Sequence, residues 1–144
     1  DQLIEHSITG SDIDDACNEV ILTIRESSQG RHNVYIVHAI GGTIFPYFAF
    51  IKVFPTEFNL FGIEYHEYYP AQTIQELAYF YTKKIQEHLK DTPFSVMGHS
   101  MGGHIAREIA VNLGLKFVVN LDTWYLDNDG IRLDFVEQFL RVRK

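Results

Sequence analysis

The segment Gly98–Gly103, GHSMGG, lies between an apolar run and a stretch with helical spacing. Its serine has a glycine two residues away on each side, which is the G-x-S-x-G pattern of a nucleophile elbow. In such an elbow the serine occupies a tight turn, and the glycines are needed because a Cβ would strike the neighbouring strand or helix. The short pattern arises by chance in about one chain in twenty of this length, so the flanking strand and helix make the interpretation specific. The alternative is a glycine-rich packing turn with an incidental serine.

Apolar runs typical of strands alternate with amphipathic helices along most of the chain. Several of the runs are continuously apolar, which is typical of parallel strands buried on both faces. The segments 19–26 and 34–40 are β-branched runs separated by a polar turn, and they indicate a pair of strands. We expect further strands at 58–65, 93–97 and 116–121, and helices within 41–54, 73–89, 102–114 and 131–144. The pattern therefore predicts the α/β class, with a mostly parallel sheet and helices on both faces.

Length and composition exclude several other classes. A chain of 144 residues with 46% hydrophobic and 22% charged residues has the size and composition of one globular domain. Its net charge of -7 argues against a nucleic-acid partner or an anionic membrane surface. The single cysteine, Cys17, has no internal disulfide partner and fits a reducing, cytoplasmic compartment.

The beginning of the chain differs in character from the rest. Residues 1–15 are polar and acidic without a sustained period, and we interpret them as a linker from an upstream domain, which leaves 16–144 as a partial domain. The opening residues do not have the pattern of a signal peptide, so we expect none here, and the first residue is Asp1 rather than methionine. The apolar run at 43–54 contains a proline and a lysine and is too short to span a bilayer. We therefore expect the chain to be a piece of a longer protein.

A second glycine-containing loop follows the strand at 34–40. The segment Val37–Gly42, VHAIGG, is expected beside the elbow because loops after parallel strands gather at the same sheet edge. Gly41 and Gly42 would let the backbone approach a substrate carbonyl, although an ordinary glycine loop is the alternative. An oxyanion hole takes one N–H from the residue after the nucleophile, here Met101, and one from such a loop.

An acidic residue follows the strand after the elbow helix. Asp122 ends the run VVNLD, and the helix before this strand returns the chain to the sheet edge that bears Ser100. A carboxylate in this position can orient and stabilise a catalytic imidazole. A capping or turn aspartate is the alternative, and Asp127 and Asp129 are less suited because they lie in a polar loop.

From about Glu19 to Asp122 the chain resembles the thioesterase domain that ends fatty acid, polyketide and nonribosomal peptide synthases, a member of the α/β-hydrolase fold. Together the matching segments are more specific than the elbow alone. Ala39 departs from the family, which has proline in H-P-x-G-G, and we read this change as tolerable. The matching segments are YIVHAIGG (35–42), FNLFGIEY (58–65), TIQELAYFYTKKIQ (73–86) and PFSVMGHSMGGHIAREIA (93–110). By this resemblance Ser100 is the nucleophile, Asp122 the acid, and the amides of Ile40 and Met101 form the oxyanion hole.

The histidine of the triad has no counterpart in the sequence. In this fold the order is serine, acid, histidine, and no histidine follows His104. The resembled family continues into a lid and two more strands before its histidine, so we expect these C-terminal strands to be missing here. We expect no histidine of this chain to lie between Asp122 and Ser100. The histidines near strand ends or the elbow are interpreted as structural, and the others as solvated: His38, His66, His99 and His104 in the first group, and His6, His32 and His88 in the second. No pair has metal-ligand spacing on a helix, so we predict no metal site.

Two functions of different classes follow. In the first, the parent domain releases an acyl or peptidyl chain from the pantetheine thioester of an upstream carrier protein, through a serine acyl-enzyme and without a cofactor of its own. A separate proofreading thioesterase and a generic serine esterase or lipase are variants of this reading. In the second, the chain is a truncated or degenerate hydrolase-like domain that binds acyl chains or a partner without turnover. The absent histidine favours the second, and the intact serine, acid and glycine loops favour the first.

Overall fold

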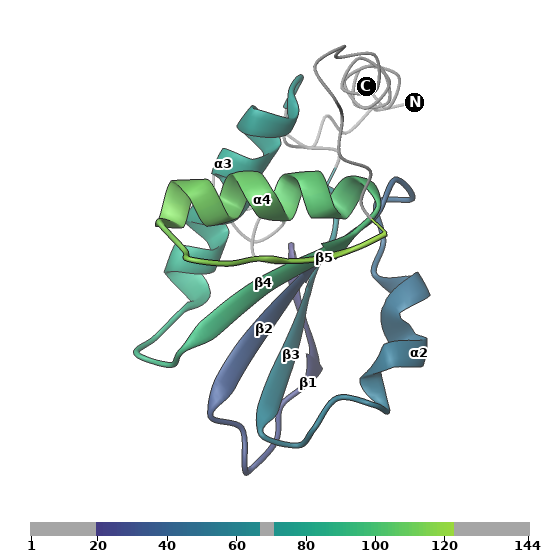
Figure 1. Cartoon of the computed structure of the whole chain (residues 1–144), viewed down its shortest axis with the longest axis vertical. Coiled ribbons are helices and arrows are strands. Elements are labelled where there is room, and N and C mark those ends of the chain that lie inside the picture. The colour runs from purple at the N-terminus through teal and green to yellow at the C-terminus, as the bar shows by residue number, and fades with distance from the viewer. Residues whose placement is uncertain (1–19, 67–70, 123–144) are drawn as a thin grey trace, which may run out of the picture.

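The structure, a computed structural model, describes residues 20–66 and 71–122, which form a mixed sheet with helices on both faces (Figure 1). The expected linker at 1–15, the expected helix at 131–144, Asp127 and Asp129 lie outside the described residues. The strands within the described ranges are β1 (Ile21–Arg25), β2 (His32–Val37), β3 (Phe58–Ile63), β4 (Phe94–His99) and β5 (Val119–Leu121).

The sheet has the strand order β1-β3-β2-β4-β5. β1 runs antiparallel to β3, and all other neighbours are parallel. The two strands predicted at 19–26 and 34–40 both form, but they are not hydrogen-bonded to each other because β3 lies between them. β2 is buried along nearly its whole length and therefore takes the centre, whereas the half-buried β1 takes the edge.

The helices begin and end at local signals in the sequence. In α3 (Ile74–His88), the Thr73 side chain caps the first turn by accepting a hydrogen bond from the Glu76 N–H at 3.1 Å. α4 (Met101–Leu113) ends at Gly114, whose φ of 64° is the left-handed conformation favoured at helix C-termini. The helix predicted within 41–54 is short: a 3₁₀ turn, η1 (Phe45–Tyr47), leads into α2 (Phe48–Ile51).

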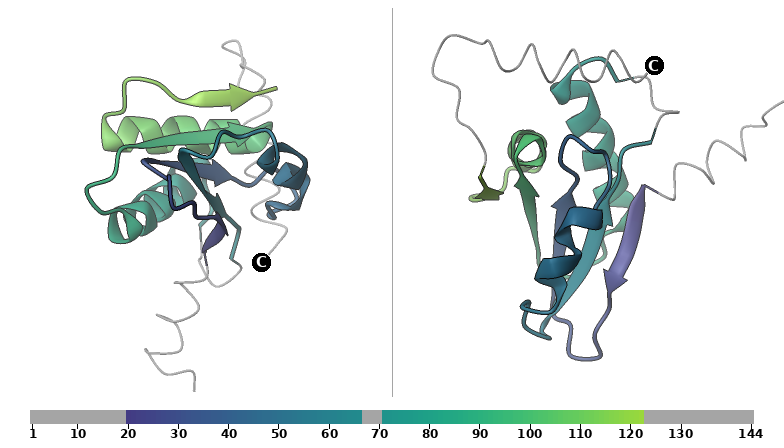
Figure 2. Two further views of the ribbon diagram at one scale, coloured as in Figure 1. Left: turned by 90° about the horizontal axis from the view of Figure 1, so that it is seen from below. Right: turned by 90° about the vertical axis from the view of Figure 1, so that its right-hand side faces the viewer.

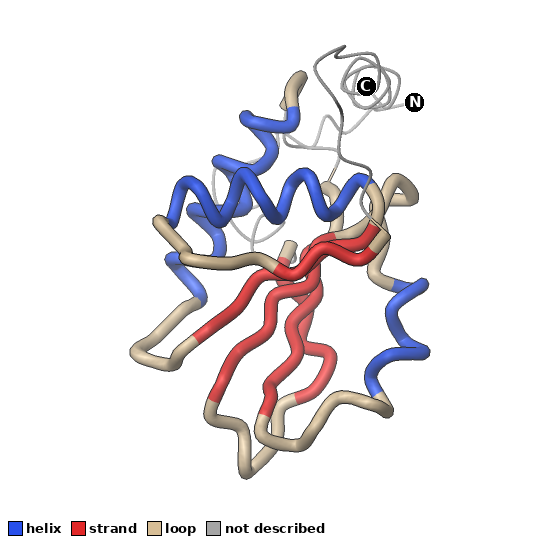
Figure 3. The backbone as a smooth tube through the Cα atoms, in the orientation of Figure 1, coloured by secondary structure: helices blue, strands red, loops and turns tan. Residues whose placement is uncertain are grey.

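Two apolar clusters enclose the sheet. The two views of Figure 2 and the tube in Figure 3 show the helices that cover the sheet. On one face α3 and α4 pack against the sheet through a cluster that includes Leu77, Tyr81, Ile105 and Ile109. On the other face Ile44, which directly precedes η1, and Tyr47 of η1 belong to a second cluster. The predicted α/β class with a mostly parallel sheet is confirmed.

The centre of the sheet contains a topological switch point. From β2 the chain moves to β3 on one side, and it then crosses over through α3 to β4 on the other side. In open α/β sheets, ligands bind outside the carboxyl ends of the strands where the order reverses in this way. The loops that follow β2 and β4 meet at this point.

Candidate active site

Ser100 occupies the turn between β4 and α4 with φ 53° and ψ −123°. A non-glycine residue with positive φ is strained by about 1–3 kcal/mol and persists only where its surroundings fix it. Here the Ser100 N–H donates to the carbonyl of Leu121 at 3.0 Å, and the Ser100 carbonyl accepts from the Gly103 N–H at 3.0 Å. The strand, strained turn and helix predicted from GHSMGG are all present.

The glycines on either side of Ser100 are required by close packing. A Cβ on Gly98 would overlap the carbonyl of Gly102, and a Cβ on Gly102 would overlap the carbonyl of His38. The first turn of α4 therefore lies directly against the end of β2. This contact brings the elbow next to the loop that leaves β2.

That loop is a tight turn over Ala39–Gly42, called the oxyanion loop below. The Gly42 N–H donates to the Ala39 carbonyl at 2.9 Å, and Gly42 has a φ of 77° that favours glycine. The Gly42 carbonyl accepts from the Tyr65 N–H at 2.8 Å. A Cβ on Gly41 would meet no atom within 4 Å, so that part of the turn faces open space.

Two backbone N–H groups near the elbow are available for a ligand. Within the part of the chain that the structure describes, no hydrogen bond uses the N–H of Ile40, and this residue is 37% exposed. The Met101 N–H is the first of α4 and so has no acceptor inside the helix. Helix N-termini favour negative charge, so the Met101 N–H suits an oxyanion, and the Ile40 N–H is a second donor in the neighbouring turn. The role of Ile40 and Met101, like that of Gly41 and Gly42, stays a prediction.

Asp122 lies one strand over from Ser100. β5 pairs with β4 in the register His99 to Leu121, so the chain places Asp122 at the same sheet edge as the elbow. The Asp122 side chain is 83% exposed, and its φ of 47° is one that aspartate tolerates better than most residues. Its position matches the prediction, while its function as the triad acid is not tested by the geometry.

A histidine that we had interpreted as structural lies beside this acid. His99 Nε2 is 4.0 Å from Asp122 Oδ2, at the limit of an ion pair. The His99 ring also packs edge-on against Tyr47, whose hydroxyl accepts from the His99 N–H at 2.9 Å and donates to the Val37 carbonyl at 2.8 Å. Sequence reasoning missed the contact of His99 with Asp122, because it depends on the register between β4 and β5. It also missed Tyr47, because this side chain reaches His99 from η1, which is 52 positions away in the sequence.

The remaining histidines make specific contacts of their own. His38 is fully buried and contacts Tyr81 of α3. The interpretation of His32 as simply solvated is wrong, because it is only half-exposed and bonds across the fold, whereas His88 is exposed as predicted and also makes one such bond. His32 Nε2 lies 2.8 Å from the hydroxyl of Ser95, and His88 Nδ1 lies 2.8 Å from the hydroxyl of Tyr35.

Residues 20–66 and 71–122 contain neither a metal-binding cluster nor a membrane-spanning helix. No three histidine, cysteine, aspartate or glutamate side chains gather there in a way that would hold a metal ion. None of the helices in these ranges combines the length and the apolar character needed to cross a bilayer.

With this geometry in place, the chain can be compared with known proteins. A family model described as the thioesterase domain matches residues 32–116, which include β2 to β4, the elbow and all of α4. No curated protein sequence matches the chain.

Solved structures give the fold. A four-domain nonribosomal peptide synthetase bound to AMP and glycine is 21% identical with a TM-score of 0.63, over 78% of this chain and 10% of that one. The NocB thioesterase domain from the nocardicin cluster is 17% identical with a TM-score of 0.64, over 87% of this chain and 66% of that one. YbtT, a type II thioesterase of the yersiniabactin pathway, is 16% identical with a TM-score of 0.58, over 70% of this chain and 44% of that one. The chain thus spans less than two thirds of the length of each, and it has the α/β-hydrolase-like fold that they share.

Proposed function

The chain belongs to the thioesterase domain family, and we propose that it provides the nucleophile, the acid and the oxyanion-binding amides for release of an acyl or peptidyl chain from the phosphopantetheine thioester of a carrier protein. Ser100 Oγ would attack the thioester carbonyl, so that a C–O bond forms, the C–S bond breaks and the thiol leaves with a proton. Water or a nucleophile within the acyl chain would then release the product as an acid or a ring. The domain needs no cofactor of its own in this scheme, because the pantetheine arrives with the substrate.

The observation that carries this proposal is the conformation of Ser100 between β4 and α4. A module that only binds ligands has no need of a strained residue that donates a hydrogen bond to β5 and accepts one from α4. The N–H groups of Met101 and Ile40 support the same assignment, since both residues follow strands that end at the sheet edge that bears Ser100. They would bind the oxyanion of the tetrahedral intermediate.

The general base sets the expected level of turnover. The 144 residues contain Ser100 and Asp122 but no histidine after the acid, where this fold has its catalytic base. We therefore propose that this chain alone hydrolyses a thioester no faster than its Ser100→Ala variant. Loss of the base typically lowers the rate by several orders of magnitude and leaves the contribution of the oxyanion hole and of binding.

The same fact favours a second candidate, a hydrolase-like domain that binds acyl chains or a partner without turnover. In the described part of the chain, the histidine within ion-pair range of Asp122 is His99, which belongs to the strand that bears the nucleophile. The two candidates differ in whether Ser100 reacts once a base is present.

Chemical rescue separates them. The chain and Ser100→Ala are incubated with an acyl thioester of N-acetylcysteamine, with and without added imidazole, and the released thiol is measured. We expect equal rates without imidazole and a faster rate for the unchanged chain with imidazole. Ser95→Ala is the matched control, because Ser95 lies within β4 rather than on the elbow, although its hydroxyl contacts His32.

Equal rates at every imidazole concentration would contradict the enzymatic proposal and favour binding without turnover. Strong Ser100-dependent hydrolysis without imidazole would show that the chain supplies its own base. In that case His99 is the first residue to substitute, followed by His66 and His104.

A further inference from the structure

A buried histidine lies directly beneath the oxyanion loop. His38 directly follows β2 at the switch point of the sheet and has no exposed surface. Its Nδ1 lies 2.7 Å from the carbonyl of Ala39, the first residue of the loop, and its Nε2 lies 2.7 Å from the hydroxyl of Tyr81. The ring therefore connects the loop to α3, the helix that crosses over between β3 and β4.

The two contacts determine where the imidazole proton lies. A carbonyl oxygen only accepts, so His38 Nδ1 carries the proton and donates to Ala39. In the neutral ring Nε2 is then an acceptor, and the Tyr81 hydroxyl donates to it. Burial raises the pKa of the Tyr81 hydroxyl well above its ordinary value, so that the hydroxyl keeps the proton it donates. The other acceptor within reach of the Tyr81 hydroxyl, the Glu64 carbonyl, is farther away at 3.4 Å.

The Ala39 carbonyl is the point on which the loop closes. It accepts both from His38 Nδ1 and from the Gly42 N–H, the latter at 2.9 Å. The N–H of Ile40 belongs to the peptide group that contains this carbonyl. Because a peptide group is planar, a hydrogen bond that fixes the carbonyl also fixes the direction of that N–H.

We infer that His38 is the positioning residue of the oxyanion loop, and that Tyr81 holds it in the tautomer that this task requires. The imidazole orients the Ala39–Ile40 peptide so that the Ile40 N–H points toward the elbow before substrate arrives. This inference rests on the function proposed above and adds to it two residues that do not touch the substrate.

The tautomer is measured directly by ¹⁵N NMR of the histidine side chains in the full chain at neutral pH. We expect the His38 Nδ1 signal in the protonated range and the Nε2 signal in the unprotonated range. An Nε2–H tautomer, or an imidazolium with both nitrogens protonated, would overturn the inference.

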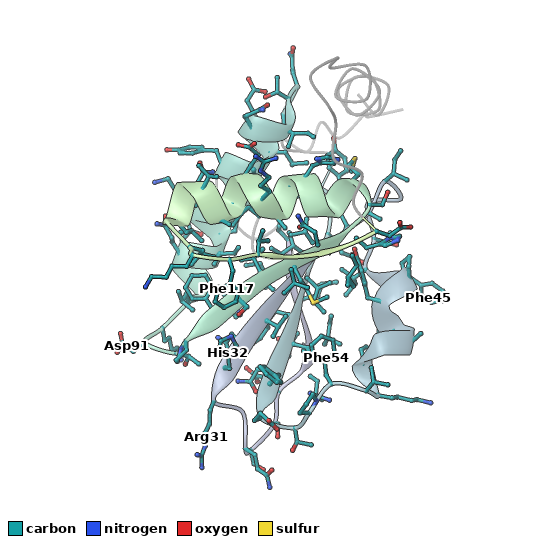
Figure 4. The ribbon with its side chains drawn as sticks, in the orientation of Figure 1. Arg31, His32, Phe45, Phe54, Asp91 and Phe117 are labelled. Carbon is teal, nitrogen blue, oxygen red and sulfur yellow. The ribbon has the colours of Figure 1, made fainter. Side chains whose placement is uncertain are left out.

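The effect on the loop is measured by hydrogen exchange at the Gly42 amide. His38→Leu should speed this exchange roughly tenfold or more, as expected when a buried hydrogen-bond donor is removed. His38→Asn, whose side-chain amide places a donor near the position of Nδ1, should restore most of the protection. His32→Leu is the matched control, because it removes a histidine from the far end of β2, near the bottom of the sheet in Figure 4.

Tyr81→Phe tests the inference without removing the histidine, and it serves if His38→Leu fails to fold. It should speed Gly42 exchange and change the His38 ¹⁵N signals, whereas Tyr79→Phe, on the same helix but 55% exposed, should change neither. Unchanged exchange and signals in Tyr81→Phe would overturn the inference. Both readouts use the chain without substrate, so they can fail while the imidazole rescue succeeds, or succeed while it fails.

Discussion

The N–H of Ser100 donates a hydrogen bond of 3.0 Å to the carbonyl of Leu121, and this bond joins the elbow to β5, which Asp122 directly follows. The ladder between β4 and β5 therefore determines both the strained turn and the position of the acid beside it. A backbone contact of this kind does not depend on side-chain rotamers. It makes the relation between Ser100 and Asp122 a property of the fold, so the predictions about the elbow are predictions about stability as well as chemistry.

Gly98→Ala should destabilise the chain more than a typical surface substitution does. The added Cβ would overlap the backbone of Gly102 in the first turn of α4, which has no flexible side chain that could move aside. We expect a loss of about 1–3 kcal/mol or more in the free energy of unfolding, measured by urea denaturation. Gly41→Ala is the control and should unfold at nearly the urea concentration of the unchanged chain, because its Cβ would meet no atom within 4 Å. Equal losses in the two variants would contradict this account of the elbow.

Tyr47→Phe should weaken the junction between β2 and β4. The hydroxyl donates to the Val37 carbonyl and accepts from the His99 N–H, so its removal deprives one buried and one partly buried backbone group of this partner. A loss of about 1–3 kcal/mol is expected for each unsatisfied buried group at most, and the amide of His99 should exchange faster with solvent. Thermal unfolding and amide exchange measure the two effects, and an unchanged melting temperature would show that the bridge is unimportant.

His88 should make the stability of the chain depend on pH. Partial burial of the ring is the main cause that lowers the pKa of His88; Glu26 acts in the opposite direction, and Lys90 adds to the lowering. The folded chain therefore binds a proton at His88 less readily than the unfolded chain does. Its stabilising effect is present above the unfolded pKa of about 6.5 and is lost as the pH falls below it.

The measurement compares urea unfolding of the unchanged chain and His88→Gln at pH 7.5 and pH 5.5. The unchanged chain should lose more stability between the two pH values than His88→Gln, since the variant lacks this titration. The same loss in both proteins would assign the pH dependence to other histidines.

Local sequence signals predicted the elements around the elbow well. Gly98, Ser100 and Gly102 fix a turn by short-range sterics, and helical spacing with a terminal glycine fixes α4, so this part needs no knowledge of distant contacts. The edge position of β1 was not predictable in this way, because strand order depends on which strand can be buried on both faces. The shortness of α2 is a similar case: Phe45 projects into solvent with 77% exposure (Figure 4), so the aromatic residues of this segment do not form one buried helical face.

In the candidate site, too, local sequence signals predicted some features, while others depend on contacts between distant residues. Ser100 and the position of Asp122 followed from motif and strand alternation. The contact of His99 with Asp122 depends on the β4–β5 register, and the bond between His38 and Tyr81 joins residues that are 43 positions apart. Tyr81 lies at an apolar position of the helical spacing of α3, and this spacing identifies the position without showing what the hydroxyl contacts. A buried tyrosine nearly always has a polar partner, and this is the signal that points toward the histidine.

The central claim, that Ser100 is the nucleophile, is tested most directly by covalent labelling. The chain is incubated with a fluorophosphonate probe in the presence of imidazole, and the modified peptide is identified by mass spectrometry, with Ser95→Ala and Ser100→Ala in parallel. We predict that the probe modifies Ser100 in the unchanged chain and in Ser95→Ala, and that labelling disappears in Ser100→Ala. Labelling that persists in Ser100→Ala at another residue would contradict the assignment and, with it, the proposed chemistry.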